Sequence, residues 1–202
     1  ALPISFIYPA FPPQQHTKHQ HSTIRNTKPK KQESLSNDDF RAIELHGKTS
    51  LMIRNIPNQL RKLHLVKILN EHCAEQNRGC QCGIVSEFDF LYLPMDFLKH
   101  TNLGYAFVNF TTETAAKKFW DSFSGYKWQV SINRKTCRIT KALIQGKKEL
   151  FKRFEKSTFN CRNIDYLPVV FHPPSNGLNR CDQIILGRLG GSSSPVGKCI
   201  DG

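Results

Sequence analysis

Residues 103–110 constrain the fold of this chain most strongly, because they alternate like a strand that carries aromatic rings on one side. Successive side chains of a strand point to opposite faces of a sheet. Tyr105, Phe107 and Asn109 therefore share one face. The other face receives the small or apolar residues, which are Gly104, Ala106, Val108 and Phe110. A strand that presents rings where polar residues usually stand suits stacking on nucleic-acid bases.

Further segments predict the rest of a compact module around this strand. Three more segments read as strands, namely residues 51–56, 88–94 and 136–141. Apolar residues recur at helical spacing in residues 60–73, and Thr111 or Thr112 is placed to cap a second helix that runs to about residue 123. The order strand, helix, strand, strand, helix, strand predicts an α+β fold, a ferredoxin-like βαββαβ sandwich. Its two helices cover one face of an antiparallel sheet and leave the other face free.

Several runs of residues resemble a known family. Residues 103–110 resemble the signature octamer of the RNA recognition motif, and they depart from it only at the first position, where Leu103 replaces a basic residue. Longer runs resemble the C-terminal recognition motif of Mei-two-like RNA-binding proteins, above all the terminal-ear-like branch of plants. These runs are residues 88–97, 102–110, 142–147 and 166–171, with Trp128 and Cys137 between them. The resemblance covers roughly residues 49–174.

The resemblance implies a function as well as a fold. Members of this family bind RNA selectively through this motif and regulate meiosis or the development of meristems and leaves, usually in the nucleus. The resemblance therefore implies a post-transcriptional regulator. The short basic run Lys28-Pro29-Lys30-Lys31 is compatible with a nuclear address, so we expect a nuclear protein that can also occur in the cytoplasm.

The free face of the predicted sheet supplies the candidate RNA-binding residues. We expect Tyr105 and Phe107 to stack on bases and Met52 and Tyr92 to extend that platform. The polar candidates are Asn55 and Asn109 for base edges, and Arg54, Arg138, Lys141, Lys147 and Lys148 for phosphates. A formal net charge of +13 supports a polyanionic partner, and we expect that partner to be single-stranded RNA.

The chain divides into four regions by composition. Residues 1–46 read as a disordered basic arm rich in Pro, Gln and His, and residues 47–157 as the recognition motif with a C-terminal helix. Residues 158–176 form an apolar extended tail that we expect to dock on the domain, and residues 177–202 read as a disordered tail. The amphipathic helix within residues 145–157 extends the RNA site, lies across Tyr105 and Phe107 until RNA displaces it, or adds core area without a function of its own, and we favour the last of these.

Other functions are less well supported by the sequence. No catalytic arrangement and no phosphate-binding loop is present, so we expect neither an enzyme nor a cofactor nor a small-molecule substrate. No run of residues is apolar enough to predict insertion into a membrane. Two alternatives stay open. The fold can hold a protein partner on its helical face, or His72, Cys73, Cys80 and Cys82 can bind zinc in a stabilised variant.

Overall fold

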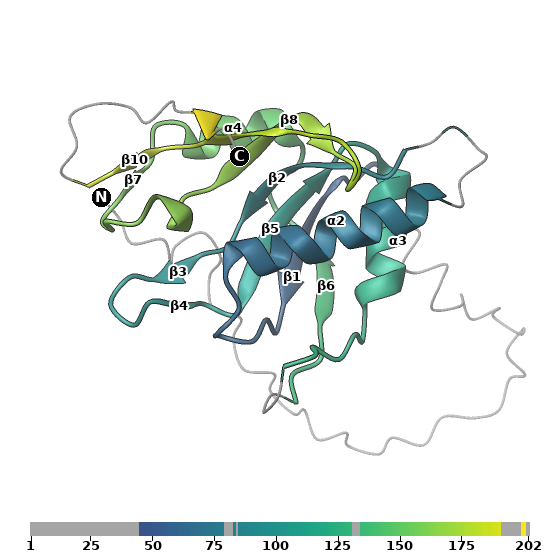
Figure 1. Ribbon diagram of the computed structural model, residues 1–202, viewed down its shortest axis with the longest axis horizontal. Helices are drawn as coiled ribbons and strands as arrows, with labels where there is room; N and C mark the ends of the chain where they lie inside the picture. Colours follow the sequence, from purple (N-terminus) through teal and green to yellow (C-terminus); the bar gives the residue numbers. More distant parts are fainter. Residues whose placement is uncertain (1–44, 79–82, 84, 131–133, 191–198, 201–202) are drawn as a thin grey trace, which may run out of the picture.

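The architecture is taken from a computed structural model that describes residues 45–78, 83, 85–130, 134–190 and 199–200. Its main element is a sheet with the strand order β11-β9-β8-β2-β5-β1-β6 (Figure 1). The four strands of the predicted module are β1 (Ser50–Arg54), β2 (Phe88–Tyr92), β5 (Tyr105–Phe110) and β6 (Arg138–Lys141). β1 lies between β5 and β6 and is antiparallel to both, while β2 is antiparallel to β5. The predicted ferredoxin-like order of strands is thus confirmed.

Two helices cover one face of this sheet, as predicted. They are α2 (Lys62–Arg78), which crosses the front of the sheet in Figure 1, and α3 (Glu113–Phe123), whose Phe119 ring lies 5.2 Å from the His72 ring of α2. The Thr112 side chain caps α3 by accepting a hydrogen bond from the Ala115 N–H. Phe110 of β5 packs on Phe119 of α3 with ring centroids 5.2 Å apart. The apolar side of each strand therefore builds the core beneath the helices.

A C-terminal extension widens the sheet beyond β2. β8 (Val169–Ser175) pairs with β2, and β9 (Asp182–Ile185) pairs with β8, both antiparallel. β11 (Cys199–Ile200) pairs with β9 in turn. The expectation of a disordered tail from residue 177 is therefore wrong for residues 177–190, since alternating apolar side chains such as Ile185 find a place against the widened sheet. The predicted arm of residues 1–46 lies almost wholly outside the described residues.

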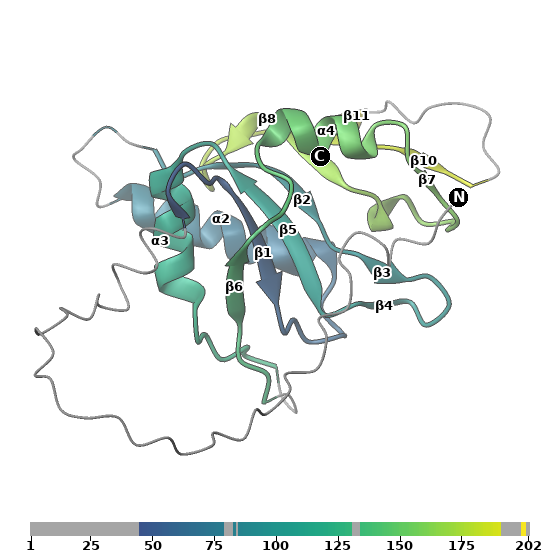
Figure 2. The same ribbon diagram turned by 180° about the vertical axis from the view of Figure 1, so that it is seen from behind.

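Shorter elements lie beside the sheet, and one of them, the β3–β4 hairpin, directly precedes β5 and Tyr105. β3 (Met95–Asp96) and β4 (Thr101–Asn102) form a small hairpin, and β7 (Thr158–Phe159) pairs with β10 (Arg188–Leu189). A 3-10 helix, η2 (Ile164–Tyr166), follows β7. In Figure 2 the β3–β4 hairpin projects to the lower right, beside the end of β5. These elements shape the surroundings of the predicted RNA face.

The predicted C-terminal helix is present as α4 (Lys147–Phe154) and lies on the face opposite to α2 and α3. Its apolar residues Leu150 and Phe154 are buried against the sheet. Figure 2 shows that α4 crosses the upper end of the sheet, whereas the lower ends of β1, β5 and β6 are crossed by none of the described helices. The free face expected from the sequence is therefore only partly free.

Candidate nucleic-acid interface

The sheet face opposite to α2 consists of a covered half and an open half, which we define by their residues. The covered half is the β2 side, where the Phe154 ring lies 5.0 Å from Tyr92 and 5.9 Å from Phe90 between centroids. Phe159 adds a further ring 6.0 Å from Tyr92. Tyr92 keeps only 1% of its surface exposed as a result. It belongs to the core, so the expectation that it extends a stacking platform is wrong in this conformation.

The open half is formed by the lower ends of β1, β5 and β6. Tyr105 is half-buried and meets Phe107 edge to face, with ring centroids 5.7 Å apart. The register places Arg54 opposite Tyr105 and Met52 opposite Phe107. Phe107 and Met52 are 6% and 8% exposed, so both are more buried than we expected. The platform that this half presents is therefore narrow, with Tyr105 as its most accessible ring.

Asn109 has a structural role instead of the predicted role in reading bases. Its carbonyl oxygen accepts hydrogen bonds from the hydroxyls of Thr49 (2.9 Å) and Ser50 (2.6 Å). Its amide nitrogen donates to the Asp89 carboxylate (2.8 Å). The Ser50 hydroxyl in turn accepts from the Gly146 N–H, at the start of α4. Asn109 is buried, and its contacts tie β1, β2 and β5 together beneath the first residue of α4.

Asp89 connects the same network to a predicted phosphate ligand. Its carboxylate lies 3.9 Å from the Lys147 ammonium, which is one-third exposed. Burial raises the pKa of Asp89, although its hydrogen bond with Asn109 and the charge of Lys147 oppose that rise. Lys147 is thus engaged in fixing α4, whereas its neighbour Lys148 is exposed. Of these two lysines, Lys148 is the better placed for phosphate.

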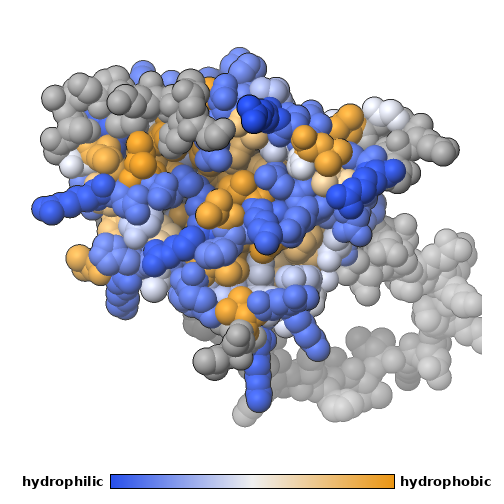
Figure 3. All heavy atoms as spheres, viewed as in Figure 1, coloured by the Kyte–Doolittle hydropathy of each residue, from blue (hydrophilic) through white to orange (hydrophobic). Residues whose placement is uncertain are grey.

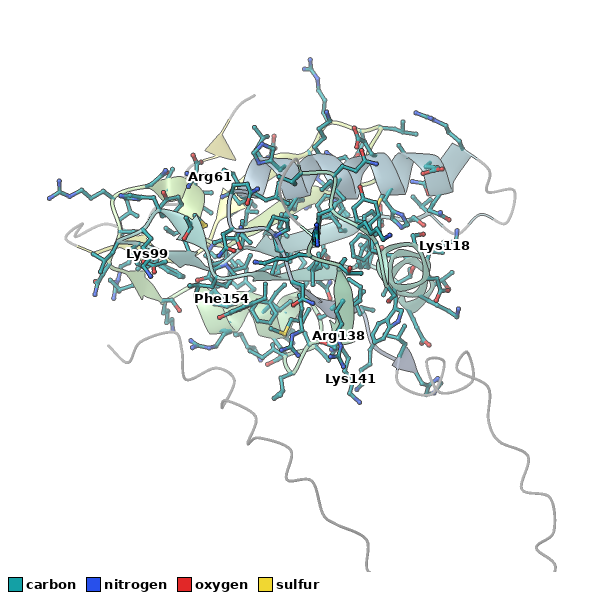
Figure 4. All side chains as sticks on the ribbon, turned by 90° about the horizontal axis from the view of Figure 1, so that it is seen from below. Arg61, Lys99, Lys118, Arg138, Lys141 and Phe154 are labelled. Carbon is teal, nitrogen blue, oxygen red and sulfur yellow. The ribbon has the colours of Figure 1, made fainter. Side chains whose placement is uncertain are left out.

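The remaining predicted contacts surround the open half. Arg138 is opposite Arg54 in the sheet, and both Arg138 and Lys141 are exposed on β6. Figure 4 labels Arg138 and Lys141 on one side of Phe154 and Lys99 of the hairpin on the other. Asn55 is exposed just after β1, in a left-handed conformation (φ 60°), and its amide donates to the Thr136 carbonyl. Exposed cations therefore lie along this face on both sides of Phe154.

The surroundings of His72 and Cys73 do not support the zinc alternative. His72 is buried in α2, edge-on to Phe119 (5.2 Å) and Phe123 (5.6 Å). Burial raises the pKa of the Cys73 thiol to about 12, which disfavours the thiolate that a metal binds. In the part of the chain that the structure describes, no group of three or more potential metal ligands comes together. Cys80 and Cys82 lie outside the described residues.

Sequence reasoning missed the contribution of the β3–β4 hairpin and η2. Phe97 of the hairpin stacks on Tyr166 of η2 with an interplanar angle of 5°, and the His100 ring lies 6.2 Å from Tyr166. The aromatic residues Phe97 and Tyr166, which are 69 residues apart, were the available signal, but nothing in the sequence says that their segments meet. None of the described helices is both long and apolar enough to cross a bilayer.

Comparisons with known proteins agree with this geometry. The model of the family "RNA recognition motif 2" matches residues 48–155, more than half of the chain. The chain belongs to this family. It is 41% identical to the rice protein "MEI2-like 6" over 70% of the chain and 46% of that protein. It is also 37% identical to maize "terminal ear1", over 76% of the chain and 24% of that protein. The resemblance to Mei-two-like and terminal-ear-like proteins is therefore confirmed.

These relatives are longer than the segment they share with this chain, which spans less than half of each. Among solved structures, the chain matches the second RRM domain of the yeast poly(U)-binding protein at 18% identity, with 46% of this chain and 93% of that chain covered. The TM-score of that match is 0.35, too low to support a functional conclusion. The matched family is defined by a recognition motif and not by a catalytic activity.

Proposed function

We propose that this chain binds single-stranded RNA on the open half of the sheet. The observation that carries the proposal is the half-buried Tyr105 ring, which lies beside Phe107 and is followed across β1 and β6 by Arg54 and then Arg138. A base of any identity stacks on an accessible ring, and the two guanidinium groups neutralise phosphates on the β1 and β6 side of that ring. Membership of the recognition-motif family and the net charge of +13 support the same partner.

Titration of fluorescein-labelled random RNA oligonucleotides, read as fluorescence anisotropy, tests the proposal. Stacking on one ring contributes about 1–3 kcal/mol, so Tyr105→Ala should weaken binding roughly 5- to 150-fold. Tyr105→Phe is the matched control, because it keeps the ring and removes only the hydroxyl. Retention of wild-type affinity by Tyr105→Ala, or equal losses in both variants, would contradict stacking at this position. The double variant Tyr105→Ala/Phe107→Ala should lose more still.

The biological role is a second step of the proposal. The named relatives, including maize terminal ear1, support a regulator that acts after transcription, in meiosis or in meristem and leaf development. We place this role in the nucleus, consistent with the basic run of residues 28–31. Imaging of the tagged full chain in plant cells checks the location. A signal that stays in the cytoplasm during meiosis and in meristems would contradict it.

A protein partner on the helical face is the competing function. Leu63 of α2 is 75% exposed, and it borders a hollow of about 770 Å³ along α2 that Leu178 also lines. Figure 3 shows that the apolar side chains on this face form separate groups among hydrophilic ones. Such scattered groups are common on protein surfaces, so they favour RNA on the opposite face. Partners that survive ribonuclease treatment in a pull-down and depend on Leu63 would reverse this order.

A further inference from the structure

A second hollow lies at the end of the sheet beside the open half. Its volume is about 450 Å³, and it lies between the turn of the β3–β4 hairpin and the segment from β7 to η2. The residues that line it include Phe97, Leu98, His100, Asn160, Arg162 and Tyr166. Both walls lead directly to the sheet face. β4 continues into β5 and Tyr105 within a few residues, and Asn160 directly follows Phe159, whose ring contacts Tyr92.

Contacts within the protein hold the hairpin wall in place. The Asp96 carboxylate accepts hydrogen bonds from the N–H groups of Leu98 and Lys99, both at 3.0 Å. His100 adopts a left-handed conformation (φ 55°), which is uncommon for a residue with a side chain. Its carbonyl accepts a 2.6 Å hydrogen bond from Arg61. The shape of the turn is therefore fixed before any ligand binds, which lowers the entropic cost of binding.

Tyr166 forms the shared wall of the hollow. Its ring stacks on Phe97 with centroids 6.1 Å apart, and its hydroxyl lies 3.2 Å from Nδ1 of His100. The Asn163 side chain fixes the start of η2 by accepting a hydrogen bond from the Asp165 N–H. These contacts join the hairpin to a segment that follows it by about 60 residues. The hollow is thus a built feature of the fold and not a gap between two loose loops.

The side chains around the hollow have the chemistry of a nucleotide site. The lining includes the cation of Arg162, the imidazole of His100 and the amide of Asn160, but no carboxylate. Leu98, at the tip of the hairpin, is 92% exposed and offers an apolar surface. Single-stranded RNA is bound by this combination of apolar or aromatic surface, amide groups and positive charge.

We propose that this hollow binds one nucleotide of the same RNA strand, next to the base that stacks on Tyr105. The inference rests on the proposed function, because the strand reaches the hollow from the open half of the sheet. Arg162 contacts the phosphate, and Asn160 donates and accepts hydrogen bonds at the base edge. The C-terminal extension therefore adds a contact that the four-stranded module alone does not supply.

Binding of RNA probes of two lengths to the full chain tests this site. With random probes of ten nucleotides, which can occupy both places, Arg162→Ala should weaken binding about three- to tenfold. With probes of four nucleotides, which the open half can hold alone, the same variant should bind nearly as well as wild type. Arg180→Ala removes an equally exposed cation beyond β8 and is the control for net charge. It should alter neither affinity.

The outcomes separate this inference from the proposed function. If Tyr105→Ala weakens binding while Arg162→Ala matches Arg180→Ala for both probe lengths, the site in the hollow is overturned and the RNA platform stands. If the wild-type chain binds neither probe, both the proposed RNA binding and the site in the hollow are overturned. Amide shifts give a second measurement on the wild-type chain. Titration with the ten-nucleotide probe should move the signals of residues 97–100 and 160–163, and their failure to move would also overturn the site.

Discussion

The covered and open halves of the sheet face carry similar aromatic patterns, but their rings differ in how they are packed. β2 presents Phe90 and Tyr92 and β5 presents Tyr105 and Phe107, so both strands place aromatic rings on the same face. The β2 rings are core because α4 packs Phe154 against them, whereas none of the described helices packs on the end of β5 near Tyr105, which stays half-buried. An aromatic pattern in a strand therefore marks a surface that needs a binding partner. Whether a helix of the same protein covers that surface depends on segments elsewhere in the chain.

The largest expected effect is on stability and concerns Phe154, the residue of α4 that covers the β2 rings. Phe154→Ala removes a buried ring, and we expect the free energy of unfolding to fall by about 3–5 kcal/mol in urea titrations. Phe151→Ala on the same helix is the control, because that ring is 38% exposed and should cost far less. We expect RNA affinity per folded molecule to stay unchanged in both. An increase in affinity on Phe154→Ala would show that α4 is a displaceable lid and would remove the distinction between the halves.

The face of the sheet that α2 and α3 cover can be compared with the open half by a pH test. We expect its polar side chain His72 to be buried in the protein and not to contact RNA. Burial, and secondarily the charge of Lys118, lowers the pKa of His72 from 6.5 to about 4. As the pH falls below about 6.5, His72 is protonated in the unfolded chain but stays neutral in the folded chain. The free energy of unfolding therefore decreases as the pH drops from about 6.5 towards 4. At pH 5 the loss is roughly 2 kcal/mol relative to pH 7.

His72→Leu should remove this part of the pH dependence. Urea titrations of wild type and variant at pH 7 and pH 5 measure it, and the other titrating groups, Asp89 among them, contribute equally to both proteins. Parallel pH profiles for the two proteins would contradict a buried, neutral His72.

A smaller effect is expected at the hydroxyl of Tyr92 in the covered half. This hydroxyl is buried and has no hydrogen-bond partner among the described residues, and burial raises its pKa above the usual value. A buried polar group without a partner is destabilising, so Tyr92→Phe should raise the free energy of unfolding by about 1 kcal/mol. RNA affinity should not change. Weaker RNA binding by Tyr92→Phe would mean that RNA reaches the covered half.

The smallest effect distinguishes single cations on the two halves. Lys141 is exposed on β6, the edge strand whose lower end carries Arg138 of the open half, whereas Lys148 lies on the helix above the covered half. Lys141→Gln should reduce the slope of log affinity against log salt by about 0.7, the value for one phosphate contact with a single strand. Lys148→Gln should reduce the slope less, and Lys67→Gln on α2 should leave it unchanged. Equal slopes for the Lys141 and Lys148 variants would place the RNA across both halves.

The sequence sufficed for the features that depend on local pattern. Alternation within residues 103–110, the cap at Thr112 and the order of six elements all led to the fold that is observed. The burial of Tyr92 and the bonding of Asn109 could not be predicted, because both depend on where α4 lies. The same holds for the hollow between the β3–β4 hairpin and η2, whose walls come from segments distant in sequence. Periodicity gives the face of a strand but not the partner that the face meets.

The strands β8 and β9 have a practical consequence for any shortened form of this protein. Without them, β2 would be an outer strand whose five residues, all now buried, would present unpaired backbone groups beside a row of aromatic side chains. Such a strand is a template for pairing with other chains. A product that ended at α4 would therefore self-associate, and laboratory fragments should extend to residue 190 to remain monodisperse.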